Sequence, residues 1–247
     1  MIEIRGFLPA SLSEWDGRIC AVIFTPRCNW RCPYCHGWRF VREDPSLPVI
    51  AMNTVFTYLD QQREWLDGVA ISGGEPTLQP DLAFFLQNIK DRGLAVKVET
   101  NGSRPDVLEL LLEKRLIDCL SLDYKAPLDE RMLRTIGMED AKGDIVLAVR
   151  RSFALAAASG IEREYHTTLC PAFVDAPTLE AMGAALEPDG LWVLQQYQPA
   201  DCLTPALAGE RQYNADELAA LEEVAQRHHR RVLMRLGHGR SRTPTLP

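Results

Sequence analysis

The sequence predicts an α/β fold, a partial (β/α)6 TIM-like barrel, and three observations support this prediction. Short runs rich in β-branched residues alternate with amphipathic, helix-like segments through most of the chain. An alternation of this length implies parallel strands joined by right-handed crossovers. Six such units fit within the 247 residues, which suits a partial barrel. An open, doubly wound sheet is the alternative architecture.

The expected elements follow one another in a regular order. Strands are expected at 20–25, 69–72, 95–100, 119–123, 164–169 and 191–195. Helical periodicity places helices at about 51–66, 80–92, 105–115, 143–159 and 177–186. Asp81, Pro105 and Pro177 lie near the starts of three of these helices, where the chemistry of the first turn favours them.

The two ends of the chain are expected to complete the barrel. The first residues, to about Asp16, are expected to pack across one end of it. A helix at 214–227 and a strand at 231–235 are expected to close the chain, within about 213–236. The Arg-, Thr- and Pro-rich tail at about 238–247 is expected to be flexible.

Length and composition describe an ordinary soluble chain. No low-complexity linker divides it, so we expect one domain over 1–247 with its core at about 18–200. A hydrophobic fraction of 46% and a charged fraction of 25% exclude general disorder. A net charge of -7 and a pI near 5.3 argue against nucleic acid or anionic lipid as a partner.

Targeting signals are not recognised in the sequence. The N-terminus lacks the pattern of a signal peptide, and the longest apolar stretch, Phe153–Ala158, is too short to cross a bilayer. We therefore expect a cytoplasmic protein with neither a nucleic-acid nor a membrane partner. The cysteine count agrees, because seven is an odd number and a disulfide framework is not expected in such a chain.

Three of the cysteines form a dense loop directly after the first expected strand. The segment is Cys28-Asn-Trp-Arg-Cys32-Pro-Tyr-Cys35, and barrel active sites lie at this end of the strands. Three thiolates can bind three irons of a [4Fe–4S] cubane and leave the fourth iron open to substrate. A structural zinc site needs four protein ligands, and His36 could supply the fourth. A zinc- or iron-binding module without catalysis therefore stays an alternative.

At these residues the sequence resembles the radical S-adenosylmethionine (SAM) superfamily. Most similar are the activases of glycyl-radical enzymes, described as anaerobic ribonucleoside-triphosphate reductase activating proteins. The short segments that carry this similarity are Gly6-Phe7-Leu8, Ser11-Leu12, Asp16-Gly17, Phe24-Thr25, Cys28-Asn29 and Cys32-Pro33-Tyr34-Cys35-His36. The resemblance runs from about residue 5 to about residue 200. It implies a barrel of the radical SAM type, with a [4Fe–4S] cluster on Cys28, Cys32 and Cys35 and with Tyr34 beside the bound cofactor.

A second motif, Ser72-Gly73-Gly74-Glu75-Pro76, follows the second expected strand. Paired glycines allow close backbone approach to a ligand, although alone the motif is simply a turn that leads into a helix. By resemblance, the motif binds the amino group of the methionine part of SAM. An ammonium group prefers backbone carbonyls and a carboxylate acceptor, which Gly73, Gly74 and Glu75 offer.

Two further motifs end the third and fourth expected strands. The first, Glu99-Thr100-Asn101-Gly102, contains Asn-Gly, a common turn signal. The second, Asp123-Tyr-Lys125, looks like the Asp-x-Lys motif of the activases. The resemblance implies that Thr100 and Asn101 contact SAM and that Asp123 helps to bind a monovalent cation. Glu99 replaces the aspartate more usual for that cation site. Lys125 can pair with the cofactor carboxylate, and a solvated lysine is the alternative.

The fifth strand carries His166-Thr167-Thr168, where relatives often have Arg-Thr-Thr. Arginine binds a carboxylate with two hydrogen bonds, whereas histidine is shorter and titrates near neutrality. His166 is therefore a candidate cofactor contact and equally a candidate core histidine. The sixth strand ends in 195–199, Gln-Gln-Tyr-Gln-Pro, whose amides could face the adenosine.

The other four cysteines have no assigned chemistry. Cys170 and Cys202 follow the fifth and sixth strands, and half-buried thiols are a simpler interpretation than a redox pair. Cys20 and Cys119 lie at strand starts, away from the cysteine loop, and are interpreted as packing residues.

The resemblance implies a radical reaction. A reduced cluster would cleave SAM to a 5′-deoxyadenosyl radical, which takes a hydrogen atom from a glycine of an anaerobic ribonucleotide reductase or a related glycyl-radical enzyme. A flavodoxin- or ferredoxin-type protein would donate the electron. The alternative substrate is a small molecule, as in 7-carboxy-7-deazaguanine synthase, whose cysteine loop is often longer.

Overall fold

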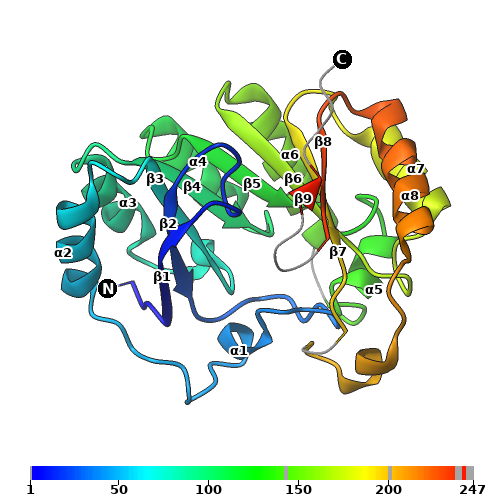
Figure 1. Ribbon diagram of the computed structural model, residues 1–247, viewed down its shortest axis with the longest axis horizontal. Coiled ribbons are helices and arrows are strands. Elements are labelled where there is room, and N and C mark those ends of the chain that lie inside the picture. Colours follow the sequence, from blue (N-terminus) through cyan, green and yellow to red (C-terminus); the bar gives the residue numbers. More distant parts are fainter. Residues whose placement is uncertain (1, 142–143, 200–201, 237–240, 243–247) are drawn as a thin grey trace.

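The centre of the molecule is one sheet whose strands follow chain order from β1 to β9 (Figure 1). The structure is a computed structural model that describes residues 2–141, 144–199, 202–236 and 241–242. The strands are β1 (Gly6–Ser11), β2 (Cys20–Thr25), β3 (Gly68–Gly73), β4 (Ala95–Thr100), β5 (Cys119–Asp123), β6 (Glu162–Leu169), β7 (Leu191–Gln196), β8 (Val232–Arg235) and β9 (Ser241–Arg242).

Strands β2 to β8 pair in parallel, and β1 and β9 pair antiparallel with the strands at the two edges. This sequential order confirms the partial barrel, because the strand order of a doubly wound sheet reverses partway. Within the described residues β1 and β9 do not pair with each other, so the barrel is open.

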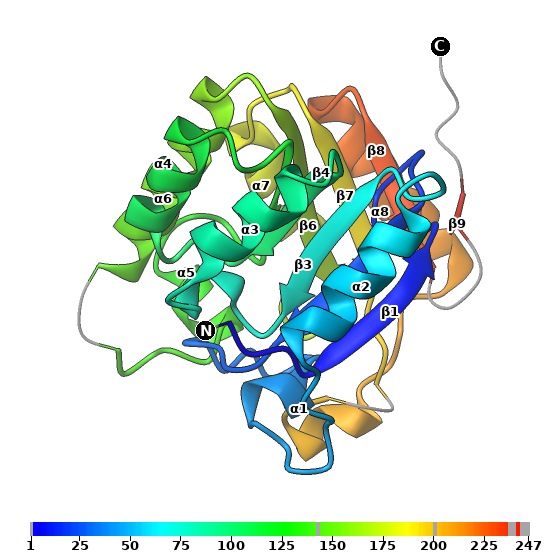
Figure 2. The ribbon, with the colours of Figure 1, turned by 90° about the vertical axis from the view of Figure 1, so that its left-hand side faces the viewer.

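The helices cover the outer face of the sheet, and Figure 2 shows α2, α3, α4 and α6 along that face. Their bounds are α1 (Trp38–Val41), α2 (Met52–Gln62), α3 (Leu82–Lys90), α4 (Pro105–Glu113), α5 (Arg131–Thr135), α6 (Ile145–Ala158), α7 (Ala176–Ala185) and α8 (Ala215–His228). Two 3-10 turns lie at Pro76–Leu78 and Pro205–Gly209. Helix α8 begins with a capping box between Asn214 and Glu217, which satisfies free backbone N–H groups. No helix in the described parts of the chain is long and apolar enough to span a membrane.

The two faces of each parallel strand meet different surroundings. On β2, Ala21 and Ile23 belong to the large apolar core between sheet and helices. Their neighbours Cys20 and Val22 point into the barrel and pack against the buried Trp15. Because both faces are covered, the strands are almost continuously apolar, which explains why the sequence predicts them well.

The N-terminal segment differs in part from the expectation. Trp15 packs against Cys20 and Cys119 at the amino ends of their strands, so residues near Asp16 do close one end of the barrel. Residues Gly6–Ser11, however, form the edge strand β1, which the sequence did not predict. A proline within this strand weakens the sequence signal, and an edge position is where proline is tolerated.

The C-terminal elements are found close to their predicted positions as α8 and β8. Residues 238–240 and 243–247 of the predicted flexible tail lie outside the described residues. The two tail residues that are described, Ser241 and Arg242, form β9 against β8. The short helices α1 and α5 were not predicted, because four and five residues are too few to show a helical period.

Candidate active site

One cavity of about 260 Å³ opens at the carboxyl ends of the parallel strands, and it gathers most of the predicted site residues. The predicted residues in its wall are Cys28, Cys32, Tyr34, Cys35, Gly73, Gly74, Thr100, Asn101, Asp123, Lys125 and His166. Other wall residues are Trp30, His36, Gly37, Val41, Ser72, Glu99, Thr167, Thr168, Gln195 and Gln196. The motifs at successive strand ends therefore form one site, as a barrel requires.

The cysteine loop is tied to its neighbours by hydrogen bonds. Arg27, just before the first cysteine, has a φ of 68°, and its N–H donates to the carbonyl of Phe40 at 2.9 Å. The side-chain amide of Asn101 donates to Asn29 Oδ1 at 2.9 Å and lies 3.7 Å from Cys28 Sγ. The loop after β4 thus holds the loop after β2 in place.

The three thiols lie in the wall of the same cavity, and their surroundings affect how readily they form thiolates. Burial raises the pKa of Cys28 to about 12 and also raises the pKa values of Cys32 and Cys35. Nearby Lys125 opposes the rise at Cys32 and Cys35, so it favours their thiolates. Three sulfur donors in the wall of one cavity fit a cluster that keeps one iron open to a ligand. His36 also lines the cavity.

The glycine pair is required by close backbone packing. Gly73 has a φ of 110°, and a Cβ there would lie 2.4 Å from the carbonyl oxygen of Thr25. A Cβ on Gly74 would lie 2.0 Å from the carbonyl oxygen of Arg27. The N–H of Gly74 donates to Thr25 O at 2.8 Å. The glycine loop therefore packs directly against the start of the cysteine loop, where a side chain has no room.

Glu75, which was predicted to contact the cofactor, is held by hydrogen bonds from its own chain, and its contact with the cofactor stays a prediction. Its carboxylate is buried, does not line the cavity, and accepts hydrogen bonds from this chain. Oε1 accepts from the hydroxyls of Thr77 and Thr100 at 2.5 and 2.7 Å, and Oε2 accepts from the Asn101 N–H at 2.7 Å. Glu75 therefore shapes the site by fixing Thr100 and Asn101, which do line the cavity.

Asp123 and Lys125 form an ion pair at the carboxyl end of β5. Lys125 Nζ lies 2.8 Å from Asp123 Oδ1, and the lysine side chain is 15% exposed. A freely solvated lysine is therefore excluded. Burial lowers the pKa of Lys125, but Asp123 and the cysteines raise it by more. The ammonium therefore stays charged. Lys125 is a cationic group inside the cavity, beside the carboxylate that was predicted to help bind a monovalent cation.

The sequence interpretation missed a buried ionic cluster behind His166. Lys97 of β4 and Glu164 of β6 point into the barrel, and Lys97 Nζ lies 2.6 Å from Glu164 Oε2. His166 Nε2 lies 2.8 Å from the same oxygen. A usable signal existed, because Lys97 is a charged residue inside an otherwise buried strand.

The remaining cysteines have packing positions, and Tyr34 both lines the cavity and packs in the interior. Tyr34 is buried beside Cys170 and Tyr197. Cys202 Sγ lies 3.8 Å from the Tyr197 hydroxyl. Both Cys170 and Cys202 are free thiols. Cys20 and Cys119 are buried at the far end of the barrel, as predicted.

A fold and a site of this kind define a class of enzyme. A family model described as the Radical SAM superfamily matches residues 22–172, and the chain belongs to this superfamily. Membership implies a [4Fe–4S] cluster and SAM as cofactors. Cys28, Cys32 and Cys35 are the residues of this chain that fit the cluster.

Particular relatives extend over different shares of the chain. A Methanocaldococcus jannaschii protein, provisionally named a glycyl-radical enzyme activating enzyme, is 28% identical over 96% of this chain and 97% of its own length. A 7-carboxy-7-deazaguanine synthase from Methanopyrus kandleri is 31% identical over 40% of this chain and 46% of its own length. Among solved structures, Streptococcus suis SuiB bound to SAM aligns with a TM-score of 0.63 over 88% of this chain and 52% of that chain, at 14% identity. This structural likeness supports the fold alone.

Proposed function

We propose that this radical SAM enzyme installs a glycyl radical on a partner protein, an anaerobic ribonucleotide reductase or a related glycyl-radical enzyme. The observation that carries the radical chemistry is the single cavity in which three cysteines, a glycine pair and Lys125 meet. The support for a protein substrate is the M. jannaschii relative, because its likeness extends over 96% of this chain.

The residues of the cavity have distinct proposed tasks. Cys28, Cys32 and Cys35 hold the cluster, and the backbone at Gly73 and Gly74 accepts the ammonium of SAM. When bound, the reduced cluster and SAM supply a 5′-deoxyadenosyl radical, which takes a hydrogen atom from the substrate. The chain itself orients the cofactors and keeps water from the reacting atoms.

Lys125 is the proposed partner of the SAM carboxylate. Its ammonium is charged, largely enclosed, and held at the cavity wall by Asp123. A pre-positioned ammonium binds a carboxylate without a large loss of side-chain freedom. The monovalent cation predicted beside Asp123 stays a prediction, and it would compete with Lys125 for that carboxylate.

A flavodoxin- or ferredoxin-type electron donor completes the proposed set of partners. The cluster must be reduced before SAM is cleaved, and the described chain offers no second group of cysteines that could hold another cluster. The electron is therefore expected to arrive from a separate redox protein.

A second candidate function is a radical reaction on a small polar molecule. The observation that favours it is the partial similarity to 7-carboxy-7-deazaguanine synthase and to a provisionally named GTP 3′,8-cyclase from Thermococcus kodakarensis. Thr168, Gln195 and Gln196 line the cavity and can hydrogen-bond to a polar ring. These matches cover less than half of the chain, which places this function second.

Anaerobic reconstitution with iron and sulfide tests the radical chemistry. We expect the absorbance of a cubane, and release of 5′-deoxyadenosine from SAM after reduction with dithionite. Cys32→Ala should abolish both, whereas Cys202→Ala should keep both because Cys202 lies outside the cavity wall. Tightly bound zinc without 5′-deoxyadenosine formation would instead support the non-catalytic metal-binding module.

Electron paramagnetic resonance with a partner tests the substrate class. The enzyme, SAM and reductant are mixed with an anaerobic ribonucleotide reductase that carries a C-terminal glycyl-radical loop. A doublet from a glycine Cα radical, lost when that glycine is replaced by alanine, is the expected result. 5′-Deoxyadenosine formation that responds to a purine nucleotide but never to a reductase would favour the small-molecule function.

A further inference from the structure

A buried ionic cluster lies inside the barrel next to the cavity, on the side towards the amino ends of the strands. Lys97 and Glu164 come from β4 and β6, with one strand between them, and their side chains are 0% and 1% exposed. Their closest atoms, Lys97 Nζ and Glu164 Oε2, are 2.6 Å apart. Lys97 Nζ also lies 3.5 Å from Glu99 Oε1 and donates to the backbone carbonyl of Glu14. A buried ammonium needs a partner of opposite charge, and Glu164 and Glu99 supply it for Lys97.

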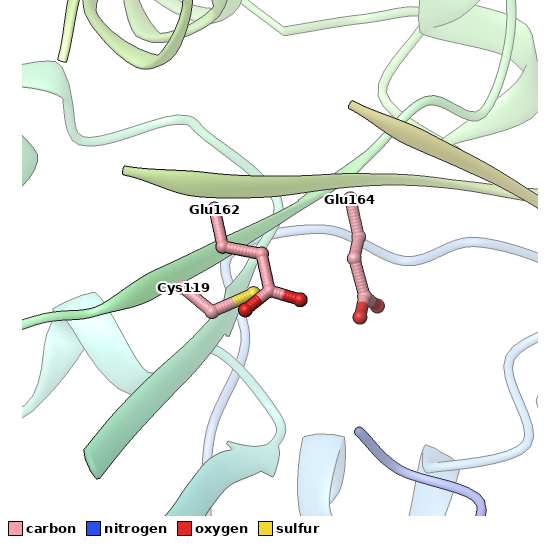
Figure 3. Close-up of side chains that lie close together, drawn as sticks. All are labelled: Cys119, Glu162 and Glu164. Atoms are coloured by element: carbon pink, nitrogen blue, oxygen red, sulfur yellow. The ribbon is translucent and has the colours of Figure 1, made fainter. Parts of the chain in front are cut away.

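A metal ion is not needed to explain these acidic groups. Cys119, Glu162 and Glu164 have ligand atoms within 4.8 Å of one another, and Figure 3 shows them on neighbouring strands. The positive charge beside Glu164, however, is already supplied by Lys97. The cluster therefore acts as an ion pair that supports a neighbouring residue.

That neighbouring residue is His166, two positions after Glu164 on the same face of β6. His166 Nε2 lies 2.8 Å from Glu164 Oε2, and His166 lines the cavity. Although burial raises the pKa of Glu164, hydrogen bonds and charge from His166 and Lys97 lower it to about 2. Burial lowers the pKa of His166, the hydrogen bond and the charge of Glu164 raise it in part, and the positive charges of Lys97 and Arg235 lower it further. The lowered pKa of His166 favours a neutral ring beside the ionised carboxylate of Glu164.

We propose that Glu164 and Lys97 are positioning residues that hold His166 in one tautomer, with its proton on Nε2 and a bare Nδ1 available to the cavity. An ionised carboxylate only accepts hydrogen bonds, so the ring nitrogen that contacts Glu164 must carry the proton. Lys97 keeps Glu164 ionised and fixed in place. His166 Nδ1 then accepts a hydrogen bond from a hydroxyl or amino group of the molecule bound in the cavity.

If His166 is neutral, a residue other than His166 must bind the carboxylate of the ligand. A neutral ring with a bare nitrogen repels a carboxylate, so His166 cannot replace an arginine that binds one. Lys125 is then the cationic group of the cavity that remains for this task. The tautomer rests on the contacts of this chain, and only the identity of the donor rests on the proposed function.

Nitrogen-15 NMR of the cluster-loaded enzyme, with the cluster in its oxidised state, measures the tautomer directly. The chain has five histidines, and His166→Asn identifies the signal of interest by its loss. We expect a pyrrole-like shift for Nε2 and a pyridine-like shift for Nδ1. A Nδ1–H tautomer, or a doubly protonated ring at neutral pH, contradicts the proposal.

A double variant tests the role of the ion pair. Lys97→Met with Glu164→Leu replaces the pair by apolar side chains of similar size, an exchange that buried pairs often tolerate. Without an acceptor at Nε2, the ring should populate both tautomers, and SAM binding should weaken by about twofold, because about half of the rings then carry a proton on Nδ1. Glu162→Gln is the matched control on the same strand face and should change neither property.

Two single variants separate the two ring nitrogens. His166→Gln keeps a polar atom near the position of Nε2, and His166→Asn keeps one near Nδ1. SAM binding, measured by equilibrium dialysis, should fall by about tenfold in the first and less in the second. Dialysis of methionine and of 5′-deoxyadenosine separately shows whether an amino or a hydroxyl group is the donor. Equal affinity of wild type, His166→Gln and the double variant would overturn the proposal. A wild-type enzyme that keeps the tautomer but never cleaves SAM would overturn the proposed function instead.

Discussion

At the scale of single residues, Gly74 shows how an absent side chain shapes the site. Its α-carbon lies so close to the cysteine loop that a methyl group would meet the carbonyl oxygen of Arg27 at 2.0 Å. The atom that the methyl group would meet belongs to the backbone of Arg27, so no change of side-chain rotamer can relieve the clash. The glycine loop after β3 and the cysteine loop after β2 are therefore positioned by the same contact.

Gly74→Ala should separate these two loops and destabilise the protein by about 1–3 kcal/mol, as overpacking of a tight contact does. For a chain of this size each kcal/mol corresponds to about 2–4 °C in Tm, which calorimetry resolves. SAM binding should be lost together with the stability. Gly209→Ala is the control, because its added Cβ meets nothing within 4 Å. An unchanged Tm for Gly74→Ala would contradict the packing argument.

At the scale of elements, Glu75 joins the loop after β3 to the loop after β4. Its two oxygens accept four hydrogen bonds, two from Thr77 and one each from Thr100 and Asn101. No other carboxylate of the cavity region described here is bonded so fully by its own chain. The element ends are thereby locked before any ligand binds.

Glu75→Gln should break this link, because an amide presents two N–H donors where the site already supplies only donors. One buried donor is left facing another, at a cost of about 1–3 kcal/mol. Urea unfolding measures the loss, and hydrogen exchange at Asn101 N–H should report the freed backbone. Glu109→Gln, which alters an exposed pair with Arg151, should stay within about 0.5 kcal/mol of wild type. Similar losses in the two variants would argue against a special role for Glu75.

The elements also show what a sequence can and cannot predict. Strands β2, β4 and β5 have the predicted bounds, because their apolar runs are interrupted cleanly by turn residues. The cavity motifs were found because each follows a strand directly. The partners of Glu75 and the Lys97–Glu164 pair were missed, since the pair joins residues 67 positions apart and depends on the register of three strands. The edge strand β1 was missed because its short, proline-containing segment lacks a strand pattern.

At the scale of the whole molecule, the barrel separates two kinds of interior. The end near Trp15 is apolar and sealed, whereas the other end is a polar cavity with the cysteines. Lys97, Glu164 and His166 lie between the two. A buried charged layer in this position makes the stability of the entire fold depend on pH, because its groups titrate differently in the folded and unfolded chain.

The direction of this dependence follows from the two lowered pKa values. Glu164 has a folded pKa of about 2 against 4.5 for its ordinary value, so its stabilising effect is complete above pH 4.5 and is lost as the pH falls towards 2. His166, with a pKa lowered from 6.5, adds a loss of the same sign that begins as the pH falls below 6.5. Glu75 has a raised pKa and acts in the opposite direction, losing stability as the pH rises above 4.5.

Urea unfolding of the metal-free protein at a series of pH values should therefore show two separable steps. His166→Asn should remove the part of the loss that begins near pH 6.5. The Lys97→Met, Glu164→Leu double variant should flatten the part between pH 4.5 and 2, by an amount on the order of 3 kcal/mol. Both variants keep Glu75 and Glu14, whose raised pKa values both contribute to any slope that the variants share above pH 4.5. If the double variant instead lost stability with acid as steeply as wild type, the ion pair inside the barrel would not be the group that titrates.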